Sequence, residues 1–511
     1  MLSSYTFKCP PFAHQQELLE ISSEREYFAY LMEQGTGKSK PIVDNAAMLY
    51  MAQQIDCLII VAPNGVHRKW IRDDFPKHFP DNVPWKWAIW KSSSAPAERA
   101  CEALFNPGRY LRVIALNIES FSGDTSKKSK RIPKGFALVQ RLLQTFNCMF
   151  VVDESSRIKS PSSSRTENIV DLGKHSKYRR ILSGTASPES PLDLFTQFKF
   201  LSPKILGSSF FAFKPEYAQL LSANSPLIVK LLRDNPKLRM APQIVATDEI
   251  TGRPIYKNLD RLKRLIEPHS YRKTKLECFD LPPKIYKRRY FEMAKDQERM
   301  YRSLKEKQKA FFNDTLVTVI QKMTLMMRLS QLVRGYMINE EGTLTKLYPD
   351  PKKNPAIAEM LEAFEDRQEQ TIIWCRFQHE VEDVLSVLEG KAVDYYGETK
   401  HDARERNMYA FKRGEVQYLV GTVDAGGIGL DFNEIPMTFF YSNQFSSEKR
   451  QQAEDRNHRY GSKGAESEHG HGVLYEDLVC PNTVDEHILN LLASKKEISE
   501  YMMDLKVVYE V

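Results

Sequence analysis

Continuously apolar runs rich in β-branched residues occur in two sets along the 511-residue chain. A strand with one wet face alternates apolar and polar residues, whereas a strand buried on both faces is apolar throughout. Segments with helical periodicity separate the runs, as in a parallel sheet covered by helices. The sequence therefore predicts an α/β protein with two parallel-sheet lobes. The runs occupy residues 57–63, 113–116, 149–154 and 180–185 in the first set, and 371–375, 416–420, 438–441 and 472–475 in the second.

Residues 190–350, between the two sets, are rich in Lys, Arg, Leu and Met and contain only weak strand signals. Within them, apolar residues at helical spacing predict one or two helices over 296–334. A last amphipathic helix is expected from residue 484 onward. These patterns predict a first lobe (1–200), a helical insertion or linker (201–278), a helical insertion of the second lobe (279–350), and the second lobe with its C-terminal helix (351–511).

The seven cysteines lie far apart and form no Cys-x-x-Cys pair, which argues against a disulfide framework and a structural zinc site. No apolar run approaches the roughly 20 residues that a membrane span needs, and the N-terminus lacks the apolar core of a signal peptide. We therefore expect a cytoplasmic protein, or one in the host cytoplasm if it is viral, with no membrane partner. The net charge of +7 is compatible with a polyanionic partner but does not demonstrate one.

A glycine-rich turn with the sequence Gly-Thr-Gly-Lys-Ser lies at residues 35–39 and leads into a helical pattern. Glycines let successive N–H groups point inward as a nest for phosphate oxygens, and the start of a helix adds its positive dipole end. Lys38 would reach the β- and γ-phosphates of a nucleotide, and the Ser39 hydroxyl would hold Mg²⁺. The full phosphate-binding pattern has Gly where this chain has Met32, so a surface turn is the alternative for this stretch alone.

Two acidic residues, Asp153 and Glu154, close one of the apolar runs. In a nucleotide-binding lobe, an acid pair of this kind follows a buried strand near the phosphates. Asp153 would hold Mg²⁺, and Glu154 would orient or deprotonate the attacking water. Any strand can end in acidic residues, so the pair indicates a nucleotide site only together with the glycine-rich turn in the same lobe.

In their order and spacing, these stretches and several later ones resemble the motifs of superfamily 2 helicases, and among them the Swi/Snf-type ATPases that translocate on double-stranded DNA. Residues 269–284 and 297–301 are similar to the segments that join the two lobes in that family. The resemblance implies two RecA-like lobes, a DNA-stimulated ATPase, and ATP and Mg²⁺ as cofactors. The compact length resembles a stand-alone viral or prokaryotic motor. The matched stretches are residues 35–39 (motif I), 60–63 (Ia), 153–154 (II), 183–185 (III), 377 (IV), 421–430 (V) and 452–461 (VI).

The resemblance also implies which residues contact the nucleotide. Phe12 and Gln15 occupy the place of an adenine-reading glutamine motif. Arg456 and Arg459 would stabilise the charge that phosphoryl transfer develops on the γ-phosphate, and their spacing of three places both on one face of a helix. Without the other motifs, solvated helix arginines would be the better interpretation. The candidate catalytic residues are Lys38, Asp153, Glu154, Gln452, Arg456 and Arg459; the candidate cofactor-binding residues are Phe12, Gln15, Gly35, Thr36, Gly37, Lys38, Ser39 and Gly427; and the candidate metal ligands are Ser39 and Asp153.

Nucleic-acid contacts are implied by the same resemblance at the turns that follow several strands. Backbone N–H groups and hydroxyls at such turns bind phosphates without reading bases, as movement along any sequence requires. Arg272 and the basic residues of 127–134 could add contacts that weaken with salt, although charged runs are usually solvated surface. DNA, with duplex favoured, is the expected partner. The remaining candidate contacts are Pro63, Asn64, Asn117, Arg376 and Thr422.

One departure from the family concerns Ser155 and Ser156, where members carry Ala-His or Ala-Asp after the two acids. The second of these residues couples the ATP site to motif III in the family, so the coupling here would run through a hydroxyl or be looser. Three functions therefore stay open: a translocase on duplex DNA, a strand-unwinding or branch-migrating helicase, and a nucleic-acid-binding protein with a weakened ATPase.

Overall fold

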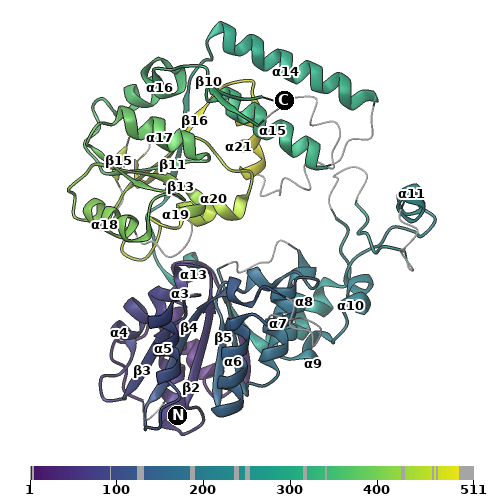
Figure 1. Cartoon of the computed structure of the whole chain (residues 1–511), viewed down its shortest axis with the longest axis vertical. Coiled ribbons are helices and arrows are strands. Elements are labelled where there is room, and N and C mark those ends of the chain that lie inside the picture. Colours follow the sequence, from purple (N-terminus) through teal and green to yellow (C-terminus); the bar gives the residue numbers. More distant parts are fainter. Residues whose placement is uncertain are drawn as a thin grey trace. The chain divides into compact units, whose positions relative to one another are not determined.

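The computed structural model divides into two compact units. The first comprises Met1–Asp248 and Pro254–Phe279, and the second comprises Glu249–Arg253 and Asp280–Val511. Each unit is built around one large, mainly parallel sheet (Figure 1). The structure describes residues 2, 5–92, 94–123, 132–184, 190–234, 241–247, 254–314, 319–339, 342–426, 432–462, 465–467 and 470–493.

The first sheet has seven strands in the order β3-β4-β2-β5-β6-β1-β7, and all its neighbouring strands are parallel. Parallel neighbours need crossover connections, which are mostly helices here and cover both faces. β2 lies between β4 and β5, inside the sheet. The strands are β1 (Tyr27–Met32), β2 (Cys57–Ala62), β3 (Trp85–Ile89), β4 (Leu111–Asn117), β5 (Cys148–Val152), β6 (Tyr178–Ser183) and β7 (Ser270–Lys273).

The central strands of this sheet bury both faces, which explains their continuously apolar sequences. In β2, Ile59 and Val61 join the core on one face, and Leu58 and Ile60 join the core on the other. Burying one such aliphatic side chain contributes roughly 1.5–3 kcal/mol. The sheet is therefore a rigid base for the loops at its strand ends.

Helices of the first unit cover both sides of the sheet (Figure 1). Among the described residues, none of the helices combines the length and the apolar character that crossing a membrane requires. The helices are α1 (Ala13–Ser22), α2 (Ser39–Met51), α3 (Val66–Lys69), the π-helical turn η2 (Trp70–Asp74), α4 (Phe75–His78), α5 (Ala95–Ala103), η3 (Ile118–Phe121), α6 (Lys134–Thr145), η4 (Ser155–Ile158), α7 (Ser164–Gly173), η5 (Pro191–Asp193), α8 (Leu194–Leu201), α9 (Pro203–Leu206), α10 (Phe210–Tyr217), α11 (Pro226–Asp234), α12 (Leu259–Ile266), η6 (Glu267–His269) and α13 (Lys275–Cys278).

The second sheet has the strand order β12-β13-β11-β14-β16, and β16 also pairs in parallel with β8 and antiparallel with the short β15. Its core again divides between two faces: Ile373 and Val420 on one, Ile372 and Leu419 on the other. The strands are β8 (Lys284–Tyr290), β11 (Thr371–Cys375), β12 (Ala392–Tyr395), β13 (Tyr418–Thr422), β14 (Met437–Phe440), β15 (Ala465–Ser467) and β16 (Gly470–Val479). The predicted fold class, two RecA-like α/β lobes, is confirmed.

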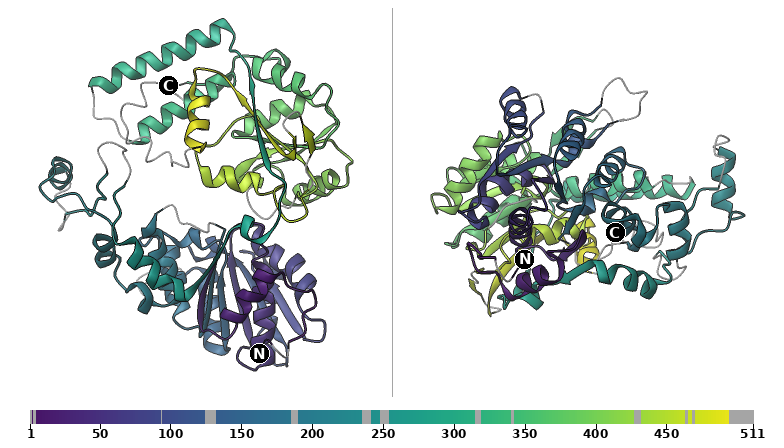
Figure 2. Two further views of the ribbon diagram at one scale, coloured as in Figure 1. Left: turned by 180° about the vertical axis from the view of Figure 1, so that it is seen from behind. Right: turned by 90° about the horizontal axis from the view of Figure 1, so that it is seen from below.

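The stretch predicted as one or two helices over 296–334 forms α14 and α15, which pack against each other (Figures 1 and 2). A small antiparallel sheet of β9 and β10 follows α15. The remaining elements of this unit are α14 (Lys295–Asp314), α15 (Val319–Val333), β9 (Tyr336–Ile338), β10 (Leu344–Lys346), η7 (Pro351–Lys353), α16 (Pro355–Phe364), α17 (Gln378–Val387), α18 (His401–Lys412), α19 (Val423–Gly426), α20 (Ser447–Glu454) and α21 (Val484–Ala493). The predicted continuation of the last helix beyond residue 493 lies outside the described residues.

Besides the small sheet of β9 and β10, two strands of the large sheets fall inside segments that the sequence predicted as helical insertions, 201–278 and 279–350. β7 pairs with β1 in the first sheet, and β8 pairs with β16 in the second. Both are outer strands of polar sequence, and β8 is half-buried or exposed along its length. They lack the continuous apolar run on which the prediction relied, because a strand at a sheet edge is not buried on both faces.

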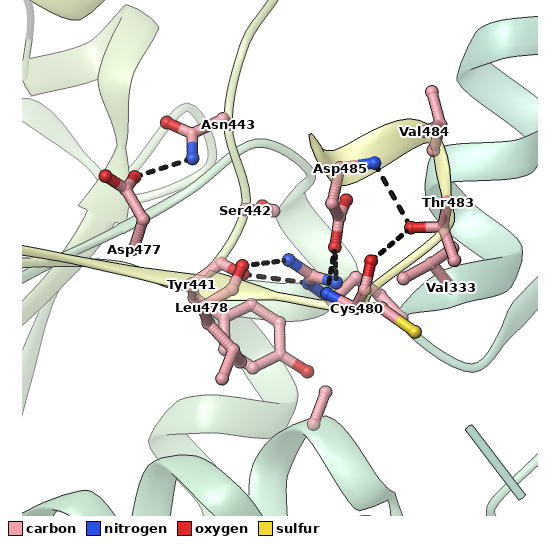
Figure 3. A network of polar contacts seen from close by, with 12 residues as sticks. Val333, Tyr441, Ser442, Asn443, Asp477, Leu478, Cys480, Thr483, Val484 and Asp485 are labelled. Carbon is pink, nitrogen blue, oxygen red and sulfur yellow. Dashed lines mark hydrogen bonds and ion pairs between the residues drawn. The ribbon is translucent and has the colours of Figure 1, made fainter. Parts of the chain in front are cut away.

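A buried arginine holds the end of α15 in the second unit. Arg334 is 1% exposed and donates to the carbonyls of Tyr441 (2.8 Å) and Leu478 (2.9 Å) and to the Asp485 carboxylate (2.7 Å). Figure 3 shows Asp485 and Thr483 at the start of α21 beside Tyr441 at the end of β14. One guanidinium thus joins α15, the sheet and α21.

Candidate nucleotide site and nucleic-acid groove

The glycine-rich turn connects the buried strand β1 to the start of α2. Gly35 and Gly37 have φ values of 86° and 78°, in the left-handed region that favours glycine. α2 begins at Ser39, so its first N–H groups face the turn. This strand, turn and helix have the arrangement that a phosphate nest requires.

The Lys38 side chain folds back over its own turn. Its Nζ donates to the carbonyl of Met32 at 2.9 Å and to that of Glu33 at 3.5 Å. These carbonyls end β1, so the amine stays beside the nest. It would exchange such bonds for phosphate oxygens when a nucleotide binds.

Residues at the start of α1 support the turn from outside. The Gln15 amide Nε2 donates to the Gly37 carbonyl at 3.0 Å, and His14 Nε2 lies 2.9 Å from the Thr36 carbonyl. Gln15 Oε1 accepts from the Phe12 N–H at 2.9 Å, while the Phe12 ring is 38% exposed. The two candidate adenine contacts, Phe12 and Gln15, therefore lie directly beside the glycine-rich turn of residues 35–39, called the phosphate turn below.

The acid pair follows β5, and its two members have different surroundings. Asp153 is buried and accepts hydrogen bonds from the Trp70 indole and from the Glu154 N–H, both at 2.9 Å. Burial and the charge of Glu154 raise the pKa of Asp153 to about 6, against the lowering effect of Trp70 and Lys38. Glu154 is half-buried and has a left-handed φ of 49°, which turns the chain from β5 into η4.

The oxygens available near the turn suit Mg²⁺. The Ser39 hydroxyl and the Asp153 carboxylate are hard oxygen donors, and Mg²⁺ in phosphate sites needs only one or two protein ligands besides phosphate and water. Within the described part of the chain, no group of three or more His, Cys, Asp or Glu side chains could hold a metal ion by itself.

Motif III and Ser155, the residue after the acid pair, also contact neighbouring elements. A Cβ on Gly184 would lie 2.6 Å from Cγ of Gln34, so motif III packs closely against the residue before the phosphate turn. The Ser155 hydroxyl donates to Oε1 of Gln197 in α8 at 2.6 Å. The third residue of motif III, Thr185, lies outside the described residues.

A groove of about 480 Å³ lies beyond the ends of β2 and β4. It brings together the predicted contacts Asn64 and Asn117, whereas Pro63, directly before Asn64, is buried and does not line it. Asn117 Nδ2 donates to Glu119 at 3.1 Å. The groove also holds cationic side chains that sequence reasoning missed, and it is lined by Asn64, His67, Arg68, Trp90, Lys91, Ser92, Asn117, Glu119, Ser120, Ser122, Pro133, Lys134 and Gly135.

Lys134, the last residue of the predicted basic run, also lines the groove, whereas Arg272, Arg376 and Thr422 lie elsewhere. Arg272 is exposed on the edge strand β7, separated from β2 by three strands, so the first sheet does not bring it to the groove. In the second unit, Arg376 follows β11, and Thr422 ends the neighbouring β13. The Arg376 guanidinium lies 3.9 Å from the ring centre of Phe445, and burial lowers its pKa to about 10. Residues 124–131, most of the predicted basic run, are outside the described part.

The predicted helical placement of Arg456 and Arg459 is corrected by the structure. α20 carries Gln452 but ends at Glu454, and the two arginines lie in the turns that follow. There the Arg456 N–H bonds to the Ala453 carbonyl three residues back, and the Asn457 side chain bonds to β14 and the residues before it. Arg456 is 2% exposed, while Arg459 is half-buried and donates to the Asp455 carbonyl at 2.6 Å.

A buried ionic network holds the end of α20 against the sheet. Glu454 accepts from Arg450 and Lys284, each at 2.8 Å, and from the Tyr286 hydroxyl at 2.9 Å. Arg450 also pairs with Asp477 of β16. Burial would raise the pKa of Glu454, but the charges of Arg450 and Lys284 prevail and lower it to about 2. Gly427, the last candidate nucleotide contact, lies outside the described residues.

Comparison with known proteins decides the family. The SNF2-related domain matches residues 28–338, more than half of the chain, and the helicase conserved C-terminal domain matches residues 352–461. The chain belongs to the SNF2-related family. Membership of this family, together with the helicase C-terminal domain, implies that the SNF2-related protein uses ATP.

Individual relatives are distant. The SNF2-related protein is 22% identical to TATA-binding protein-associated factor mot1 of Aspergillus fumigatus over 399 residues, covering 69% of this chain and 20% of mot1. It is 22% identical over 362 residues to an ATP-dependent helicase of Mycoplasma pneumoniae, covering 68% of this chain and 30% of that protein. The chain therefore spans less than a third of these relatives. A solved structure of the Sulfolobus solfataricus SWI2/SNF2 ATPase core in complex with dsDNA is 18% identical and covers 99% of this chain and 98% of its own, with a TM-score of 0.39.

Proposed function

We propose that this SNF2-related protein hydrolyses ATP to move along duplex DNA, and that DNA stimulates its turnover. The observation that carries the proposal is the placement of two sites at one edge of the first sheet. The phosphate turn and the acid pair follow β1 and β5, and the cationic groove follows β2 and β4. β2 pairs with both β4 and β5, so the groove and the acid pair have adjacent strands as their base.

Each candidate residue has a role in this proposal. The N–H groups of the turn and Lys38 bind the β- and γ-phosphates, and Phe12 and Gln15 contact the adenine. Glu154 orients the attacking water. Ser39 and Asp153 would hold Mg²⁺, which neutralises charge on the phosphate oxygens when it is bound. Arg456 and Arg459, with Gln452 nearby in sequence, would supply guanidinium groups to the γ-phosphate.

The groove suits the sugar-phosphate backbone rather than the bases. Its cationic side chains, amides and hydroxyl groups are phosphate-binding groups, and phosphate contacts carry no direct sequence information. Binding through them suits a motor that advances along any sequence. Arg376 and Thr422 would bind the same backbone from the second unit, and alternating affinity of the two units would advance the protein.

The test is ATP turnover measured with duplex, single-stranded and forked DNA and with RNA, in the wild type and in Lys38→Ala. We expect duplex DNA to stimulate turnover most, and Lys38→Ala to abolish it. A triplex-displacement assay on duplex DNA then tests movement. Separation of forked strands would favour the helicase alternative, whereas no turnover with any nucleic acid would overturn the proposal in favour of a nucleic-acid-binding protein with a weakened ATPase.

A further inference from the structure

The helical segment after β2 connects the groove to the nucleotide site without a break. α3 (Val66–Lys69) begins just after Asn64, continues as η2 (Trp70–Asp74) and then as α4 (Phe75–His78). His67 and Arg68 of α3 line the groove. Trp70 of η2 bonds to the candidate metal ligand Asp153, so one short helical segment carries residues of both sites.

Trp70 fixes the orientation of the Asp153 carboxylate. Its Nε1 donates to Oδ2 of Asp153 at 2.9 Å, while Oδ1 accepts from the Glu154 N–H at 2.9 Å. The indole is 1% exposed, so packing fixes the direction of this donor. Each carboxylate oxygen retains acceptor capacity for a metal or a metal-bound water.

The segment that carries Trp70 is π-helical. Such a turn is rare overall but common at functional sites.

We propose that Trp70 is a positioning residue of the ATPase. It holds Asp153 in place for Mg²⁺, and the segment 66–78 transmits nucleic-acid binding in the groove to this ligand. The proposed transmission rests on the proposed function, because the DNA of that function is the ligand that would bind in the groove. Removing a hydrogen-bond partner of a metal ligand typically lowers metal affinity or activity about 10–100-fold.

The first experiment measures binding of fluorescent ADP by the full chain, in Mg²⁺ and in EDTA, for Trp70→Phe, Trp70→Leu and the control Trp87→Phe. Trp87 is 51% exposed on the edge strand β3. We expect Mg²⁺ to improve affinity in the wild type and control, and this improvement to fall about tenfold in the two test variants with EDTA values unchanged. The same improvement in all four proteins would overturn the proposal.

Trp70→Phe keeps most of the buried ring, and thermal unfolding shows whether the variant is folded. Should Trp70→Leu fail to fold, Trp70→Phe decides the first experiment. A loss of the Mg²⁺ effect in Trp70→Leu but not in folded Trp70→Phe would contradict a role for the indole N–H, because both variants lack this donor.

The second experiment measures the ratio of ATP turnover with and without duplex DNA at saturating Mg²⁺. We expect Trp70→Phe to lower this ratio severalfold while DNA affinity without nucleotide stays at the wild-type value. An unchanged ratio would overturn transmission through the segment. Absence of stimulation in the wild type would instead overturn the proposed function and leave the Mg²⁺ experiment valid.

Discussion

Gly37 satisfies two separate constraints in the phosphate turn. Its φ of 78° lies in the left-handed region, and a Cβ at this position would lie 2.5 Å from Nε2 of Gln15. The same Gln15 amide bonds to the Gly37 carbonyl. Glycine is therefore required both by the backbone and by the side chain that supports the turn.

Gly37→Ala is expected to weaken nucleotide binding by about tenfold or more. A left-handed φ alone costs a non-glycine residue about 1–2 kcal/mol, and the contact with Gln15 moves the turn as well. Titration with fluorescent ADP measures the change. The matched control is Gly207→Ala, which has a φ of 85° but open space around the added Cβ. Equal affinities in the two variants would contradict the role of the Gln15 contact.

The candidate site could be predicted only where it is local in sequence. Lys38, Ser39 and the acid pair belong to short patterns whose chemistry can be inferred without a structure. Trp70 is 83 residues from Asp153, and Gln197 is 42 residues from Ser155. Such contacts depend on how helices pack on the sheet, which one sequence does not specify. The groove cations Arg68 and Lys91 were missed for the same reason.

At the scale of elements, the end of α20 depends on buried charges. Glu454 pairs with Arg450 and Lys284, and the Tyr475 hydroxyl donates to its carbonyl at 2.9 Å. The helix prediction for Arg456 and Arg459 used spacing alone and could not include these contacts from β8 and β16. The turn with the two arginines is thus built on the sheet.

Glu454→Gln is expected to destabilise the second unit by about 3–5 kcal/mol, because removing one partner leaves buried cations without compensation. Denaturant unfolding measures the loss. Glu415→Gln, which alters an exposed pair with Arg413, is the control and should leave the unfolding midpoint unchanged. Equal midpoints in both variants would contradict a stabilising network.

The pKa of the Glu454 carboxylate predicts that the stability of the second unit depends on pH. The pKa of Glu454 is lowered from 4.5 to about 2 in the folded unit. A lowered folded pKa stabilises the protein above the unfolded pKa, and that stability, about 3 kcal/mol, is lost as the pH falls from about 4.5 to 2. Unfolding measured across this window should show a smaller decrease for Glu454→Gln than for the wild type. Parallel decreases would contradict the assignment.

The cations of the groove and those of the edge strand β7 are expected to contribute differently to DNA binding. Lys91→Ala should reduce the slope of log affinity against log salt by about 1, because one phosphate contact is removed. Arg272→Ala should leave the slope unchanged, since β7 lies away from the groove. Binding to duplex DNA at several salt concentrations measures both slopes. Equal reductions would show that Arg272 also contacts DNA.

Strand burial determined how much of the fold the sequence could predict. β2, β4, β5, β6, β11, β13, β14 and β16 were located because continuous apolar runs mark strands covered on both faces. β3, β7, β8 and β12 were missed, and each lies at or near an edge of its sheet. β1 was also missed as a strand, although it is buried and leads directly into the phosphate turn.

At the scale of the whole molecule, the chain consists of two units that each have their own sheet and core. Every candidate metal ligand lies in the first unit, and the candidate arginines lie in the second. A single two-state free energy does not describe a chain of this kind. Functions that need both units can therefore be separated experimentally from nucleotide binding by the first.

Arg459→Ala is expected to lower ATP turnover by about 10³-fold, the size of effect seen for arginine fingers. Fluorescent ADP affinity should stay near the wild-type value, because the proposed phosphate contacts belong to the first unit. Arg413→Ala, on the exposed surface of the second unit, is the control. Turnover equal to that of the control would exclude Arg459 from catalysis.

Gln15 bonds to the glycine-rich turn and is also the proposed adenine contact, and these two roles limit how the sequence can change during evolution. The residue proposed to select the base is the same one that supports the loop around Gly37. A substitution of Gln15 that changes the preferred base would also change how the loop binds phosphate. The two traits are inherited together, and a shift away from adenine would have to begin with a compensating change in the loop itself.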